Sequence, residues 1–534
     1  MSSFGLNRRH LLLAGAAMSL DMTLPAALRA APRRGGILTA VLWPAPQTLT
    51  AAATTAGTEM LVSAKIFDGL CGYDFDMRPQ PLLAESWDIS ADGLRMRFNL
   101  RKGVRWHDGT PFTSKDVAFS LLKVWKVLHG RGRSTFADVT EVQTPDDTTA
   151  VFVLKRPAPA IMKALFSAES QILPAHLYDG TDILQNPFNL KPVGTGPYKF
   201  VSFERGDNLV LARNEDYWDK ELPYVDRFVF RFVPDAATRA AMLESSQAQI
   251  VPNGLLNAPD ITRLGKLPDI ELESRGYEHS CGMQLMDFNL DNPHLANLKV
   301  RQALAHAIDR NWILRNVWSN FGKAATGPIH VKQTDFYTTE GVPAYPYDIK
   351  KAEALLDEAG FKRGAGGVRF TITIDPLPYG DEPLRAAEYI REQCRRIGIA
   401  MTVRTQDFGA FVKRVYTDRD FDINIVSAST TADPTIGVQR FYWSKNFIKG
   451  VAFSNGSHYA NPEVDALLEA AQTELDASKR RDLFVRFQRI AMADLPSLPL
   501  VFNDRVTVTR KTLRDHTVGG VGPFDSQSKA WLAA

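Results

Sequence analysis

The sequence contains few cysteines, and none of them lie close together. Cys71, Cys281 and Cys394 are the only three in a chain of 534 residues. Without a CxxC pair, the sequence argues against a zinc ribbon, a thioredoxin-type redox motif and a disulfide-rich scaffold. At most one disulfide can form, so we expect the fold to depend on its hydrophobic cores.

The chain also lacks a strong excess of charge of one sign. Lys and Arg number 63 against 60 Asp and Glu, which gives a formal net charge of +3. A dedicated nucleic-acid partner is therefore not expected. Hydrophobic residues make up 45%, which is typical of a globular protein rather than a disordered one. At roughly 150 residues per domain, the length predicts three or four domain-sized units.

Recognisable catalytic and cofactor motifs are missing as well. There is no HExxH, no GxSxG and no Gly-Lys-Ser/Thr phosphate loop. We interpret His107-Asp108-Gly109 and Gly194–Pro197 as turns, and His279 and His306 as packing or surface residues rather than metal ligands. The sequence therefore predicts no catalytic residue, no metal ligand and no cofactor, and the protein is not expected to be an enzyme. An exported hydrolase using His107 and Asp108 is the remote alternative.

The N-terminus has the pattern of an export signal. Arg8 and Arg9 precede a short apolar run, residues 11–18, which is too short to span a bilayer. The paired arginines before leucines resemble a twin-arginine signal, and an ordinary secretory signal is the alternative. We predict that residues 1–30 are removed by cleavage after Ala30. The mature protein is then periplasmic and has no membrane-spanning segment.

Strand and helix patterns alternate along the mature chain. Strands are predicted at 35–43, 95–100 and 228–233, and residues 128–136 are interpreted as a surface loop. Helices are predicted from Thr113, from Asp235, over 300–317, over 348–360, from Asn461 and over 478–493.

The clearest pattern is a strand–helix–strand–helix–strand run. It covers residues 368–427 and predicts a parallel sheet. Ligands of such sheets bind beyond the carboxyl ends of the strands. The loop 428–434 is therefore the first candidate for a ligand site.

A long segment resembles a known family. Residues 83–90 (LAESWDIS), 92–94 and 98–112 (FNLRKGVRWHDGTPF) are similar to the diagnostic segment of the family 5 solute-binding proteins of ABC importers, the peptide, oligopeptide and nickel group. Shorter segments agree with the family in the same order: 193–198 (VGTGPY), 213–218, 300–310, 347–348, 355–360, Asp433-Pro434, 461–465 and 495–500.

The resemblance implies an α/β, two-lobed periplasmic-binding-protein fold with a hinge and an extra subdomain, of the cluster C type. We expect lobe 1 at 33–70, 192–283 and 500–534, the extra subdomain at 71–191, and lobe 2 at 284–499. Such a protein captures a peptide or related small solute between its lobes. It then delivers the solute to an inner-membrane permease, whose ATPase subunits power import. We expect a monomer.

The resemblance also directs attention to the loop 428–434. In peptide-binding relatives an aspartate aligned with Thr430 holds the ligand's amino terminus, and a threonine cannot form that ion pair. Nickel-chelate relatives carry bulky aromatics here, whereas Ser429, Thr430 and Thr431 leave room and offer neutral hydrogen bonds. Asp433 either binds ligand or caps the following turn. Further candidate ligand residues are Trp43, Tyr277, His279, Met283, Arg440, Phe441 and Trp443. An oligosaccharide, an opine-like compound, a metal chelate and a sensing role remain alternatives.

Overall fold

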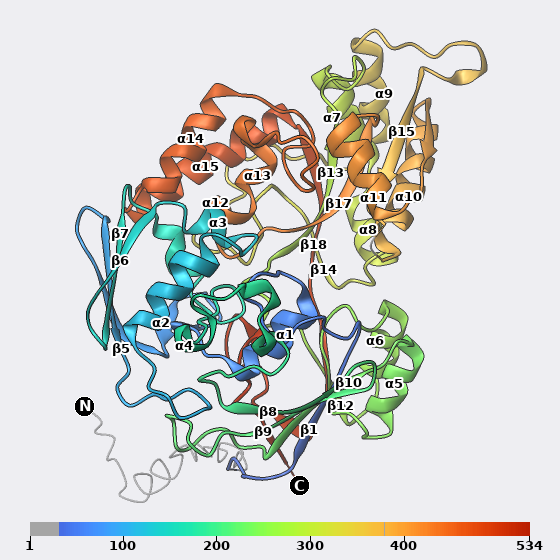
Figure 1. Ribbon diagram of the computed structural model, residues 1–534. Coiled ribbons are helices and arrows are strands. Elements are labelled where there is room, and N and C mark those ends of the chain that lie inside the picture. Colours follow the sequence, from blue (N-terminus) through green and yellow to red (C-terminus); the bar gives the residue numbers. More distant parts are fainter. Residues whose placement is uncertain (1–30, 379, 534) are drawn as a thin grey trace, which may run out of the picture.

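The computed structural model describes residues 31–378 and 380–533 (Figure 1). The predicted export signal and its cleavage site lie outside the described residues. Three sheets organise the chain: one at the lower right of Figure 1, one at its left and one at its upper right. Within the described residues, none of the helices combines the length and the apolar character that crossing a membrane requires.

The lower sheet has seven strands, in the spatial order β12 (Ile270–Glu273), β19 (Thr507–Arg510), β11 (Ile250–Val251), β1 (Ile37–Leu42), β10 (Arg227–Phe232), β9 (Asn208–Arg213) and β8 (Tyr198–Glu204). β1 and β10 are parallel, and their paired residues Leu38 and Phe228 are fully buried. The helices α1 (Gly57–Ile66), α5 (Ala236–Glu244) and α6 (Ala258–Leu264) accompany this sheet. The predicted cap is confirmed, because the Asp235 carboxylate accepts the Thr238 N–H.

The left sheet is antiparallel and has four strands. Its order is β4 (Ala84–Ile89), β5 (Arg95–Leu100), β7 (Thr149–Leu154) and β6 (Val139–Asp146). In β5, Met96, Phe98 and Leu100 are buried, as their alternation predicts. The helical elements of this region are α2 (Ser114–Phe119), a π-helical segment (Ser120–Trp125), α3 (Gly132–Thr135) and α4 (Ala175–Tyr178). Short two-stranded pairings complete the lower half: β2 (Cys71–Tyr73) with β3 (Pro79–Pro81), and β20 (Leu513–Arg514) with β21 (Trp531–Leu532).

The upper sheet has six strands, in the order β14 (Gly322–Ala324), β18 (Ser497–Asn503), β13 (Gly282–Phe288), β17 (Ile423–Ser429), β15 (Phe370–Pro376) and β16 (Ile399–Val403). β15 is parallel to both β16 and β17, which confirms the predicted parallel run. β13 is antiparallel to its neighbours. A separate hydrophobic core covers each face of this sheet.

The helices of the upper half are α7 (Leu298–Ala307), α8 (Arg310–Asn316), α9 (Ile349–Glu358), α10 (Glu382–Arg396), α11 (Phe408–Val412), α12 (Pro434–Gly437), α13 (Gln439–Tyr442), α14 (Pro462–Thr473) and α15 (Ala477–Asp494). Residues 300–317 were predicted as one helix, and this is wrong. The Asp309 carboxylate accepts the N–H groups of Asn311 and Trp312, so a second helix begins there.

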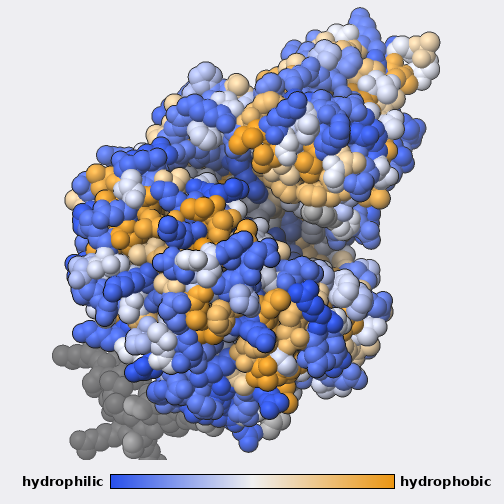
Figure 2. Space-filling model, viewed as in Figure 1, coloured by the Kyte–Doolittle hydropathy of each residue, from blue (hydrophilic) through white to orange (hydrophobic). Residues whose placement is uncertain are grey.

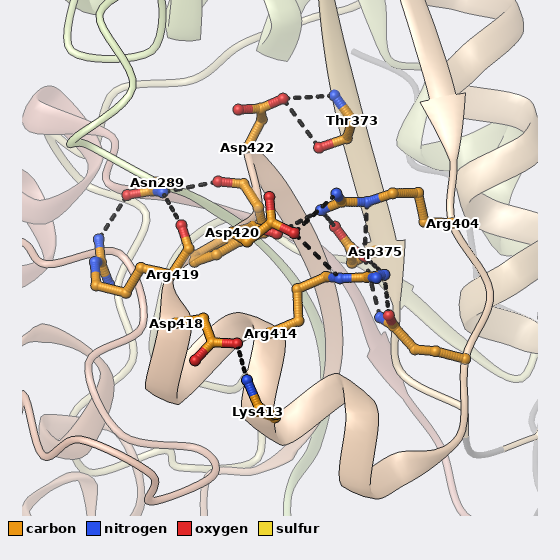
Figure 3. A network of polar contacts seen from close by, with 12 residues as sticks. Asn289, Thr373, Asp375, Arg404, Lys413, Arg414, Asp418, Arg419, Asp420 and Asp422 are labelled. Atoms are coloured by element: carbon orange, nitrogen blue, oxygen red, sulfur yellow. Dashed lines mark hydrogen bonds and ion pairs between the residues drawn. The ribbon is translucent and has the colours of Figure 1, made fainter.

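A polar network holds the chain in place just before β17 (Figure 3). The Asp375 carboxylate is fully buried and pairs with Arg404 at 2.6 Å and with Arg414 at 3.4 Å. The Asp422 carboxylate accepts the Thr373 N–H at 2.7 Å. These contacts join β15 to the segment that leads into β17, and they fix the position at which β17 begins.

The chain passes between the lower and the upper sheet through two crossover segments. Residues 274–281 connect β12 to β13, and residues 504–506 connect β18 to β19. The second passage lies a few residues beyond the predicted boundary at 499–500, because β18 remains in the upper sheet as far as Asn503. Residues from both crossover segments reach the cleft described next.

Candidate functional site

Two adjoining cavities form one cleft between the upper and lower halves of the molecule. The smaller has a volume of about 260 Å³ and the larger about 470 Å³. They are continuous, because Arg131, Ser429, Thr431 and Ile436 line both of them. Figure 2 shows the surface hollowed between these halves. Together the cavities have the size typical of small-molecule sites.

The end of β17 forms part of the wall of this cleft. The predicted site residues Ser429 and Thr431 line both cavities. Thr430 does not line either of them: its side chain is fully buried and donates a hydrogen bond to the Cys281 carbonyl at 2.8 Å. A Cβ added at Gly437 would lie 1.9 Å from the Thr430 carbonyl oxygen, so only glycine allows this loop to pack so closely.

Asp433 has the contacts of a cap and an ion-pair partner. Its carboxylate is buried, lies 2.8 Å from both Nη1 and Nη2 of Arg480, and accepts the Thr435 N–H at the start of α12. Burial acts to raise the pKa of Asp433, but the Arg480 guanidinium outweighs it and the pKa lies below its ordinary value. Asp433 is not among the residues that line the cleft.

Three of the further candidate residues line the cleft. His279 lies in the smaller cavity between the rings of Phe166 and Phe524. Burial lowers its pKa to about 4, so the imidazole is neutral at pH 7. Arg440 and Trp443 line the larger cavity.

The other four candidates lie elsewhere. Tyr277 and Met283 are buried, and the Tyr277 hydroxyl lies 2.6 Å from the Thr507 hydroxyl. Phe441 is buried beneath the Arg440 guanidinium. Trp43 is 40% exposed and lines neither cavity.

Several charged residues of the cleft were not predicted from the sequence. Arg131 lies in the stretch interpreted as a surface loop, which is wrong: His129 is buried, α3 follows, and Arg131 forms a bidentate ion pair with Glu169. Lys163 and Arg505 also line the smaller cavity. Arg505 lies in the crossover segment 504–506, a few residues after the motif at 495–500. Its closeness to that motif was the one feature of the sequence that could have indicated a place in the cleft.

The two motifs interpreted as turns pack against each other. The two ring nitrogens of His107 lie 3.2 Å from the Gly194 nitrogen and 2.9 Å from the Gly196 carbonyl. Burial lowers the pKa of His107 to about 4, and His107 lines neither part of the cleft. Across residues 31–378 and 380–533, no group of three or more His, Cys, Asp or Glu side chains is placed to hold a metal ion. Cys71, Cys281 and Cys394 are free thiols, and all three are buried.

Two halves joined by two crossover segments, with a cleft between them, define a two-lobed solute-binding protein. A comparison with protein families identifies the family to which the chain belongs. Residues 78–450 match the family model of the bacterial extracellular solute-binding proteins, family 5 (middle region). The chain therefore belongs to this family of ABC-importer binding proteins, as the resemblance predicts, and its two-lobed α/β fold is confirmed.

Curated relatives and solved structures are similar to this protein along most of its chain. It is 27% identical over 468 residues to a dipeptide-binding protein of Escherichia coli, covering 83% of this chain and 84% of that protein. It is 29% identical over 459 residues to the glutathione-binding protein GsiB of Pectobacterium atrosepticum, covering 85% and 86%. The crystal structure of the ABC transporter substrate-binding protein CtaP from Listeria monocytogenes superposes with a TM-score of 0.82 at 26% identity, covering 94% and 100%.

Proposed function

We propose that this protein captures a peptide or related small solute in the cleft and delivers it to the permease of an ABC importer. The observation that carries this proposal is the cleft itself, because its walls come from both halves of the molecule and from both crossover segments. The protein acts by binding and closure rather than by catalysis. The two curated relatives named above bind a dipeptide and glutathione, which supports a solute of that size.

The proposed lobes are those predicted from the sequence, except that the second boundary moves from 499–500 to the crossover segment 504–506, and the two crossover segments form the hinge. Ser280 and Arg505 come from the two crossover segments, and both line the smaller cavity. A solute bound there contacts the hinge and both lobes at once. It therefore stabilises the closed form by its extra contacts in that form.

Solute capture is tested by thermal unfolding of the protein after bound ligand has been removed by partial unfolding and refolding. The panel contains di- to octapeptides, amino-blocked peptides, oligosaccharides and nickel chelates. A true solute at about 100 times its Kd should add about 2.7 kcal/mol to the free energy of unfolding. Stabilisation by a sugar or a chelate alone would show that the solute is an oligosaccharide or a metal chelate rather than a peptide. If no member of the panel stabilises the protein, the result contradicts solute capture.

We also propose export through the twin-arginine route, cleavage after Ala30, and a monomeric mature protein. Replacing Arg8 and Arg9 together by lysine should retain the protein in the cytoplasm, because that route requires the arginine pair. Intact mass of the exported protein locates the cleavage site, and light scattering gives its oligomeric state. Continued export of the Lys-Lys variant would point to the general secretory route instead.

A further inference from the structure

The side chains that line the cleft carry unequal charge. Two carboxylates, Asp138 and Glu169, face the cavities. Five cationic side chains line the same cavities: Arg131, Arg156, Lys163, Arg440 and Arg505. The whole chain is nearly neutral, so this excess of positive charge is a local property of the cleft.

The carboxylates of the cleft already have partners. Glu169 accepts two hydrogen bonds from Arg131, and Asp138 pairs with Arg156 at 2.8 Å. Lys163 donates to the Met77 carbonyl at 3.0 Å and pairs with the Asp335 carboxylate at 3.4 Å. Neither carboxylate of the cleft therefore remains to compensate Arg440 or Arg505.

Arg505 is the least compensated of these cations. In the described part of the chain, no hydrogen bond or ion pair involves its guanidinium, although it lines the smaller cavity. Burial lowers its pKa, and the nearby Arg131 guanidinium lowers it further. Arg505 is partly buried and borders the cavity, so its unpaired charge is only partly solvated and this position is suited to an anion supplied by the solute.

Arg440 occupies a corresponding position in the larger cavity. Its guanidinium donates to the Ser429 carbonyl at 3.0 Å and lies 4.7 Å from the centroid of the Phe441 ring. These partners fix its orientation but carry no negative charge. Burial lowers its pKa to about 10, again with a contribution from Arg131. Arg131 therefore lies close enough to repel both the Arg440 and the Arg505 guanidinium.

The start of α1 borders the smaller cavity, with the Glu59 carboxylate in its first turn. Gly57, in its first turn, lines the cavity. No described acceptor is bonded to the N–H groups of Gly57, Thr58 and Glu59, and the Glu59 carboxylate accepts the Gln47 N–H at 2.9 Å. The N-terminal end of a helix favours negative charge.

On the basis of the proposed function, we propose that the solute is anionic, with at least two carboxylate groups, one bound by Arg505 and the other by Arg440. The two cavities meet at Arg131, so one molecule can reach both sites.

The proposal is tested by calorimetric titration of the ligand-stripped protein with matched probes. Glu-Gly-Glu, Gln-Gly-Gln and Lys-Gly-Lys differ in side-chain charge but have the same length, and tricarballylate is a non-peptide polycarboxylate. We expect the acidic peptide or tricarballylate to bind at least about tenfold more tightly than the neutral and cationic peptides. Binding should weaken as salt is added. The two anionic probes separate a peptide source of the carboxylates from a non-peptide source.

Arg505→Met is the decisive variant. Because Arg505 makes no hydrogen bond or ion pair with the described residues, the empty variant should unfold at the same temperature as the wild type or higher. Its affinity for the anionic probe should fall about tenfold or more, and Arg505→Lys should recover part of it. Arg395→Met, on an exposed side chain of α10, is the matched control and should leave binding unchanged.

The outcomes separate this inference from solute capture itself. Equal or tighter binding of the neutral or cationic peptide would overturn the anionic solute and leave solute capture intact. Unchanged affinity of Arg505→Met for the anionic probe would equally overturn it. If no probe of any charge binds and the wider panel also fails, the proposed function falls and this inference falls with it.

Discussion

Replacing Asp433 by alanine should lower the free energy of unfolding of the empty protein by about 3–5 kcal/mol. The change leaves the Arg480 guanidinium buried without its bidentate partner, and an uncompensated buried charge carries a cost of this size. It also removes the cap of α12. Denaturant unfolding in the absence of solute measures the difference.

Two further variants sharpen this experiment. Glu463→Ala removes an exposed ion pair with Arg486, 3.1 Å long, between α14 and α15. It should cost less than about 1 kcal/mol. The double variant Asp433→Ala/Arg480→Met should recover part of the lost stability, because no buried charge is left alone. An Asp433→Ala protein that unfolds like the wild type but no longer binds solute would instead assign Asp433 to the ligand.

The sequence predicted those elements whose limits are set locally. Asp235, Asp348 and Asn461 each accept an N–H at the start of the helix they were expected to begin, because a cap depends on residues only two to four positions apart. The parallel strands of 368–427 followed from their connecting helices. The predicted helix over 300–317 failed because the stop at Ile308 and the cap at Asp309 were overlooked.

The residues of the cleft were harder to predict from the sequence, because the cleft brings together residues that are far apart in the chain. Ser429 and Thr431, which line the cleft, could be predicted because ligands of such sheets bind at strand ends. Arg131 and Glu169 meet across the left half of the molecule, and no local pattern indicates that pairing. Thr430 was expected at the ligand because of its alignment with a residue of relatives, but its side chain packs away from the cavities and bonds to the Cys281 carbonyl.

A second large effect is expected at Asp287, in the centre of the upper sheet. Its carboxylate is buried, and its partner on the neighbouring strand β17 is Asn424. One oxygen of the carboxylate has no hydrogen-bond partner among the described residues. Burial raises its pKa from 3.8 to about 7, and the Asn424 amide offsets this only in part. The folded protein therefore keeps the proton at pH values where the unfolded chain has lost it.

This difference fixes the sign of the pH dependence. Between about pH 4 and pH 7 unfolding releases the Asp287 proton, so the stabilising contribution is complete at low pH and is lost as the pH rises through the folded-state pKa. From pH 5 to pH 8 the loss amounts to about 3 kcal/mol. Asp287→Asn keeps a neutral side chain at every pH and should not show this loss.

The measurement is the free energy of unfolding of Asp287→Asn relative to the wild type, at pH 5 and at pH 8. The variant should gain about 3 kcal/mol relative to the wild type across that interval. All other titrating groups, including the buried Asp68 with its raised pKa of about 7, are common to both proteins and cancel. Asp482→Asn, at an exposed position, is the control and should follow the wild type. A relative stability of Asp287→Asn that does not change with pH would show that Asp287 ionises in the folded protein as it does in the unfolded chain.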